Sequence, residues 1–79
     1  MEHFLAERYL AGQDPASLEQ EADRVRRAAE RAGRVRLVTT LYVPDDELCF
    51  YLLESDSVEA AGEAGDFDRI VRVDVAGAV

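Results

Sequence analysis

The first three residues carry the most specific metal-binding pattern in the sequence. His3 is the only histidine of the chain, and it follows Met1 and Glu2. A free amino terminus, two backbone amides and an imidazole at position three supply four nitrogens in one plane, the geometry that Cu(II) and Ni(II) favour. The sequence therefore offers Met1, Glu2 and His3 as a candidate Ni(II) site. The alternative is an exposed histidine at the start of a strand.

Two further groups have suitable chemistry for a site but a simpler interpretation. The acidic residues 45–47 offer oxygen ligands, yet they follow Pro44 in a stretch typical of a turn, and no EF-hand spacing accompanies them. Cys49 could be a nucleophile or a soft metal ligand, but there is no second histidine to activate it. We therefore interpret residues 45–47 as a solvated turn and Cys49 as a buried or half-buried thiol.

The arginines between residues 24 and 36 resemble a basic patch. However, Asp23 and Arg27 are spaced i,i+4, and Glu21 and Arg24 are spaced i,i+3, so each pair can form an ion pair on one helix. We therefore interpret this stretch as a solvated and paired helix face rather than as an anion site.

The composition restricts the class of function. The chain has 79 residues and a net charge of -8, and nucleic-acid binding that ignores base sequence depends on basic surface. There is no run near the roughly 20 apolar residues that cross a bilayer, and the start does not resemble a signal peptide. A single cysteine cannot form an intrachain disulfide, which fits a reducing compartment. We expect one cytoplasmic domain over residues 1–79, with no nucleic-acid or membrane partner.

Four strands are predicted from runs of β-branched, aromatic and aliphatic residues. They cover residues 3–10, 35–43, 48–54 and 67–75.

Two helices are predicted between these strands. Asp14 and Pro15 supply an N-cap and a first helical residue, apolar residues then recur at spacings of three and four, and Gly33 stops the helix. A shorter helix is predicted within residues 55–65. The order β-α-β-β-α-β is the ferredoxin-like α+β arrangement, a four-stranded antiparallel sheet with two helices on one face.

The alternation of residues along the strands predicts which side of the sheet each side chain faces. One set of alternate positions is more purely apolar, and the other contains all three tyrosines. We expect the apolar set, Phe4, Ala6, Leu37, Leu41, Phe50 and Leu52, to face the helices. We expect the tyrosine set, Leu5, Glu7, Tyr9, Val38, Thr40, Tyr42, Cys49, Tyr51 and Leu53, to form the open face.

Such an open face is too apolar to be left in water, and tyrosine suits interfaces and ligand pockets. We therefore expect a homodimer formed through the open sheet face. The dimer could enclose a cavity, or its tyrosines could simply pack against each other. The residues expected to line the cavity are Glu7, Tyr9, Tyr42, Cys49, Tyr51 and Arg72.

Three motifs follow one another along nearly the whole chain, namely F-L-x-E-R-Y-L-x-G at 4–12, D-x-L-C-F at 46–50 and F-D-R-I at 67–70. Together they resemble a family of short bacterial nickel-binding proteins of largely unknown physiological role. The resemblance implies a ferredoxin-like fold, a dimer and Ni(II) binding.

Three functions remain open from the sequence. The first is a small dimeric binding protein for Ni(II) or another divalent transition metal. The second is a cofactor-free enzyme or ligand-binding dimeric α+β barrel, for which Glu7 with Tyr9 or Tyr51 is the acid–base set that the residues offer. The third is a purely structural or interaction module. We expect a binding protein rather than an enzyme, because no catalytic motif is present.

Overall fold

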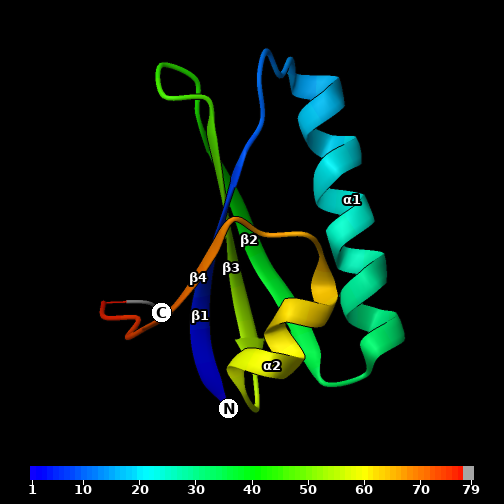
Figure 1. The fold of residues 1–79 in the computed structure, drawn as a ribbon, viewed down its shortest axis with the longest axis vertical. Helices are drawn as coiled ribbons and strands as arrows, with labels where there is room; N and C mark the ends of the chain where they lie inside the picture. The colour runs from blue at the N-terminus through cyan, green and yellow to red at the C-terminus, as the bar shows by residue number, and fades with distance from the viewer. Residues whose placement is uncertain (78–79) are drawn as a thin grey trace.

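The computed structural model describes residues 1–77, which fold in the predicted order β-α-β-β-α-β (Figure 1). The elements are β1 (Glu2–Tyr9), α1 (Pro15–Ala32), β2 (Val35–Val43), β3 (Leu48–Ser55), α2 (Val58–Ala61), the 3₁₀ turn η1 (Gly62–Ala64) and β4 (Arg69–Val73). The predicted bounds of β2 are confirmed. The predicted last strand is too long, because β4 is shorter than expected, whereas the predicted short helix within residues 55–65 is present as α2 followed by η1.

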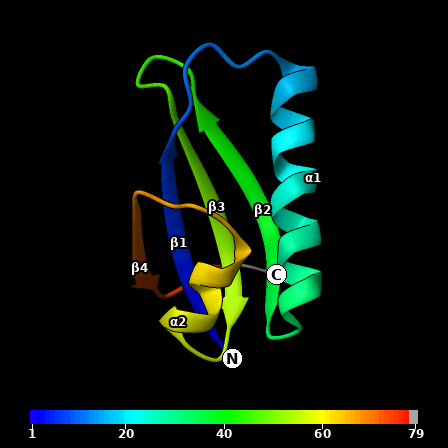
Figure 2. The same cartoon turned by 45° about the vertical axis from the view of Figure 1, so that its right-hand side comes forward.

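The strands form one antiparallel sheet in the order β2-β3-β1-β4. This confirms the predicted ferredoxin-like α+β fold. Residues of α1, α2 and the sheet share one buried cluster, so both helices pack on the same side (Figure 2). Within residues 1–77, no helix covers the opposite side of the sheet.

Helix α1 begins and ends where its capping residues predict. The side chain of Asp14 accepts a hydrogen bond from the Ser17 amide at 2.7 Å, which lowers the pKa of the Asp14 carboxyl. At the other end Gly33 adopts φ 77°, and its amide donates to the Ala29 carbonyl at 3.1 Å. Val25 and Ala29 are buried, so the apolar stripe of α1 faces the sheet.

Strand β1 has the predicted faces. Phe4 and Ala6 are buried on the helix side. The pairing of β1 with β3 places Phe4 opposite Leu53 and Ala6 opposite Tyr51. Residues that lie opposite each other share a side of the sheet, so Leu53 and Tyr51 face the helices as well.

The predicted faces of β3 are therefore wrong. Cys49, Tyr51 and Leu53 are 0% exposed on the helix side, whereas Phe50 and Leu52 are only half-buried and lie on the open side. Tyr51 is accommodated in the core because its hydroxyl donates a hydrogen bond to Glu21 of α1.

The predicted faces of β2 are only partly correct, because the strand contains a bulge. The pairing with β3 shifts between residues 37 and 39, so Val38 is an extra residue and the alternation of faces changes there. Before the bulge, Leu37 packs against the core as predicted. After it, Leu41 is 59% exposed on the open side. The predicted face is confirmed for Leu37 and wrong for Thr40, Leu41 and Tyr42.

Candidate functional site

The open side of the sheet carries a continuous apolar centre. Leu5 of β1 lies opposite Leu52 of β3 on one side and opposite Val71 of β4 on the other, and Leu41 of β2 lies opposite Phe50. We define the open sheet face by six of the apolar residues on this side, which are Leu5, Leu41, Leu48, Phe50, Leu52 and Val71. Each of them keeps part of its surface in contact with solvent.

Charged pairs border this apolar centre on the same side of the sheet. At one end, Arg69 Nη1 lies 3.6 Å from Glu7 Oε1. At the other end, Glu54 lies 3.5 Å from the His3 imidazole and 3.4 Å from the Arg36 guanidinium. The hydrogen bond from Arg36 lowers the pKa of the Glu54 carboxyl, against a smaller opposing effect of burial.

A second group of polar residues lies between α1 and the sheet, around Glu21. Arg8 of β1 donates to Glu21 Oε1 at 2.9 Å, and the Tyr51 hydroxyl donates to the same oxygen at 3.1 Å. Arg24 Nε donates to the other oxygen, Oε2, at 3.1 Å. Burial alone would raise the pKa of Glu21, but the hydrogen bonds from Arg24 and Tyr51 and the charges of Arg24 and Arg8 outweigh it and lower the pKa.

The interior groups beside Glu21 are held in their neutral forms. Burial, followed by the neighbouring Cys49, raises the pKa of the Tyr51 hydroxyl. Burial also raises the pKa of the Cys49 thiol, which is 0% exposed. A neutral, buried thiol is a poor nucleophile and a poor metal ligand. The prediction that Cys49 is a buried thiol is confirmed.

The remaining tyrosines fasten the β1–α1 connection to the hairpin. The Tyr9 hydroxyl donates to Glu47 Oε1 at 2.9 Å, and the Gly12 amide donates to Glu47 Oε2 at 2.9 Å. The Tyr42 hydroxyl donates to the Leu10 carbonyl at 2.6 Å. Because its carboxylate accepts both of the first two bonds, Glu47 is a structural member of the turn rather than a fully solvated acid, and its φ of 52° lies in the left-handed region.

The predicted cavity residues do not converge on one place. Cys49 and Tyr51 lie in the core, whereas Glu7 faces the open side with Arg69. The proposed acid–base set of Glu7 with Tyr51 is therefore divided by the sheet. The other members are also dispersed, because Tyr9 and Tyr42 hold the hairpin end and Arg72 is exposed beside Asp74 and Glu2.

Sequence reasoning missed the residues that meet around Glu21, although the pattern contained a signal for them. Glu21 is spaced three residues after Leu18 and four before Val25, so it interrupts the apolar stripe of α1. Arg8 alternates with Phe4 and Ala6, which places it on the helix side of β1. A charged residue at each of two core-facing positions predicts a buried ion pair.

The candidate metal residues lie at the amino end of β1. Met1 is 69% exposed, Glu2 lies 3.6 Å from Arg72 Nε, and His3 faces Glu54. Among residues 1–77, three or more His, Cys, Asp or Glu side chains do not gather in any one place that could hold a metal. The same part of the chain contains no helix long and apolar enough to cross a membrane.

Neither a protein-family profile nor a curated protein sequence matches the chain. Among solved structures, the fold is similar to the crystal structure of SCO4226 from Streptomyces coelicolor A3(2), with a TM-score of 0.74 and 26% sequence identity. The similarity covers 92% of this chain and 96% of that chain, so the two proteins share the whole β-α-β-β-α-β arrangement.

Proposed function

We propose that the chain is a small homodimeric binding protein whose two copies meet through the open sheet face. The observation that carries the proposal is the apolar centre on a side of the sheet that no described helix covers, in which Leu41 is 59% exposed. A four-stranded sheet with strands of up to nine residues extends over roughly 500 Å². A typical stable interface buries about 800 Å² on each partner, so the face with its charged border approaches the required size.

The charged border favours a second copy of the same chain as the occupant. A two-fold axis brings the same surface of each copy together. The charged border of one copy therefore faces the same charged residues of the other copy. Here each acidic residue is already beside a basic one, Glu7 with Arg69 and Glu54 with Arg36. These pairs can exchange partners across the axis without leaving like charges opposed.

The test is the mass of the chain in solution at micromolar concentration, measured by sedimentation equilibrium. The wild type is expected to be a dimer, and Leu41→Glu is expected to be a monomer because it places a charge in the centre of the interface. Val58→Glu is the matched control, since Val58 is 44% exposed on α2, away from the sheet face. A monomeric wild type, or a Leu41→Glu variant as dimeric as the control, contradicts the proposal.

A second candidate function is the binding of Ni(II) or another divalent transition metal at the amino end of β1. It is favoured by the position of His3, whose Nε2 lies 3.5 Å from Glu54 Oε2 at the border of the open sheet face. An imidazole and a carboxylate suit such a metal, and the terminal amine and amides of Met1, Glu2 and His3 can complete a square plane. Because Glu2 pairs with Ser55, this second set requires the first residues of β1 to leave the sheet.

The metal proposal is tested by calorimetric titration of Ni(II) into the tag-free chain beginning at Met1. His3→Ala is expected to abolish binding, and Glu59→Gln, an exposed acid on α2, is the control that keeps it. Glu54→Gln distinguishes the two ligand sets. Binding weakens if the Glu54 carboxylate and the His3 imidazole hold the metal, and it is unchanged if the terminal amine and backbone amides hold it with His3. Binding that survives His3→Ala, or no binding to the wild type, overturns this proposal and leaves the dimer proposal untouched.

A further inference from the structure

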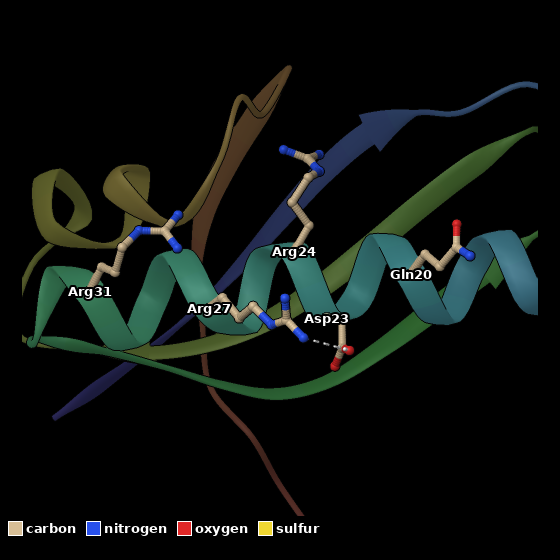
Figure 3. Close-up of a pocket in the computed structure, with 5 residues that line it drawn as sticks. All are labelled: Gln20, Asp23, Arg24, Arg27 and Arg31. Carbon is tan, nitrogen blue, oxygen red and sulfur yellow. Dashed lines mark ion pairs between the residues drawn. The ribbon is translucent and has the colours of Figure 1, made fainter.

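The outer surface of α1 carries an open groove of about 420 Å³ that neither proposed function uses. It is lined by Gln20, Asp23, Arg24, Arg27 and Arg31 (Figure 3). These residues are spaced by three and four along the helix, so they form one continuous row on the side of α1 that carries no apolar stripe. The groove therefore presents three guanidinium groups and one carboxylate.

The predicted ion pairs Glu21–Arg24 and Asp23–Arg27 are both present, but they do not neutralise every arginine of the groove. Arg24 is fixed by Glu21 through its Nε and Nη2 atoms, whereas its Nη1 atom contacts no carboxylate among residues 1–77. Arg27 lies 3.8 Å from Asp23 with 73% of its side chain exposed. Arg31 forms no ion pair or side-chain hydrogen bond with any residue in the described range 1–77. In Figure 3 the side chains of Arg24 and Arg31 extend toward the same side of the helix.

This local charge contrasts with the rest of the molecule, whose net charge is -8. Apart from Glu21 and Asp66, which act directly on Arg24, the acidic residues outside the groove repel an anion only weakly, because charges are screened over about 8 Å at physiological ionic strength. An anion held in the groove would contact the guanidinium groups that line it. They therefore decide whether an anion binds there.

The length of the row indicates the kind of anion. Arg24 and Arg31 are seven residues apart, which corresponds to about 10 Å along a helix. A single phosphate can contact neighbouring arginines but not both ends of the row. Guanidinium groups bind phosphate oxygens in pairs of parallel hydrogen bonds. A group of two linked phosphates matches the row better, and the Gln20 amide can donate a further hydrogen bond.

We propose that this groove binds a small anion that carries a diphosphate group. None of the residues that line it is aromatic, so the surface offers nothing on which a nucleobase can stack. The groove therefore recognises the diphosphate group itself, whether this group belongs to inorganic diphosphate or to a nucleoside diphosphate.

The experiment is a calorimetric titration of inorganic diphosphate into the full chain at physiological ionic strength, about 0.15 M, without divalent cations. The variants are Arg31→Ala, which removes a groove cation, and Arg34→Ala, which removes an exposed arginine just beyond the helix and outside the groove. We expect one ion bound per chain, a loss of about tenfold in affinity for Arg31→Ala and little change for Arg34→Ala. Circular dichroism of both variants checks that the fold is retained.

Two further titrations define the ligand. Orthophosphate is expected to bind more weakly than diphosphate, and a nucleoside diphosphate is expected to bind about as well as inorganic diphosphate. The proposal is overturned if diphosphate gives no saturable binding at millimolar concentration, or if the two arginine variants lose affinity equally, because charge alone then explains the binding. Equal affinity for orthophosphate, or much tighter binding of the nucleotide, overturns the assignment of the diphosphate as the recognised group. None of these outcomes depends on dimerisation or on metal binding.

Discussion

The hydroxyl of Tyr51, at the centre of the sheet, donates a hydrogen bond to Glu21 of α1 at 3.1 Å. Arg8 reaches the same carboxylate oxygen from the neighbouring strand β1. Three elements that are distant in the sequence are thus joined at one oxygen atom, inside the layer between helix and sheet. A buried charge of this kind is stable only while its partners are in place.

Removal of the Tyr51 hydroxyl is expected to destabilise the fold. In Tyr51→Phe the ring keeps its packing against Phe67, with centroids 5.3 Å apart, while Glu21 loses a buried donor. We expect the free energy of unfolding, measured in urea, to fall by about 1 kcal/mol. Tyr9→Phe is the control, because Tyr9 donates to Glu47 at an exposed position. An equal loss of free energy of unfolding in the two variants would show that the buried hydrogen bond of Tyr51 stabilises the fold no more than the exposed one of Tyr9.

The lowered pKa of Glu21 predicts how stability depends on pH. A carboxyl whose pKa is lower in the folded state than in the unfolded chain stabilises the fold fully above its ordinary pKa, and this stabilisation is lost as the pH falls through the folded-state value. Urea unfolding at a series of acidic pH values should therefore show a steeper loss of stability for the wild type than for Glu21→Gln. Parallel curves for the two proteins would contradict the assignment.

The N-cap of α1 is expected to contribute measurably to stability. Asp14→Ala removes the acceptor for the Ser17 amide, and we expect a loss of about 1 kcal/mol in the free energy of unfolding. Asp45→Ala, in the exposed hairpin turn, is the matched control and should change stability by less than about 0.5 kcal/mol. Thermal unfolding followed by circular dichroism distinguishes the two, and a control as destabilised as Asp14→Ala would rule out a specific cap.

Deletion of Val38 is expected to preserve the fold. Because Val38 is the extra residue of the bulge, its removal leaves Leu37 facing the helices and Leu41 facing the open side. We expect the free energy of unfolding to stay within about 1 kcal/mol of the wild type. Deletion of Leu41 is the contrasting variant, since it moves Tyr42 to the opposite side and should abolish cooperative unfolding. Similar stability of the two deletions would contradict the assigned bulge.

The sequence was sufficient for the order of elements but not for the orientation of their side chains. Asp14, Pro15 and Gly33 mark the ends of α1 by local chemistry that tertiary contacts do not change. Strand β3 has apolar or aromatic residues at nearly every position of 48–54, so it contains no alternation from which its inner face can be derived.

The candidate site was predicted poorly for the same reason. The tyrosines were assigned to the open side because the other set of alternate positions is more purely apolar, but the hydroxyl of Tyr51 finds its partner in a carboxylate on the helix. The bulge at Val38 is set by the pairing with β3 and has no marker of its own in the sequence. The charged residues Arg8 and Glu21, in contrast, could have been found from their spacing.

The bulge in β2 also bears on the solubility of the protein. β2 is one of the two edge strands of the sheet and has nine residues, of which Leu41 and Val43 are exposed. A long, regular and apolar edge is a template for strands of other molecules, and such pairing leads to aggregates. The extra residue interrupts the row of free backbone groups on this edge. We therefore expect Val38 to make edge-to-edge pairing with another molecule less favourable.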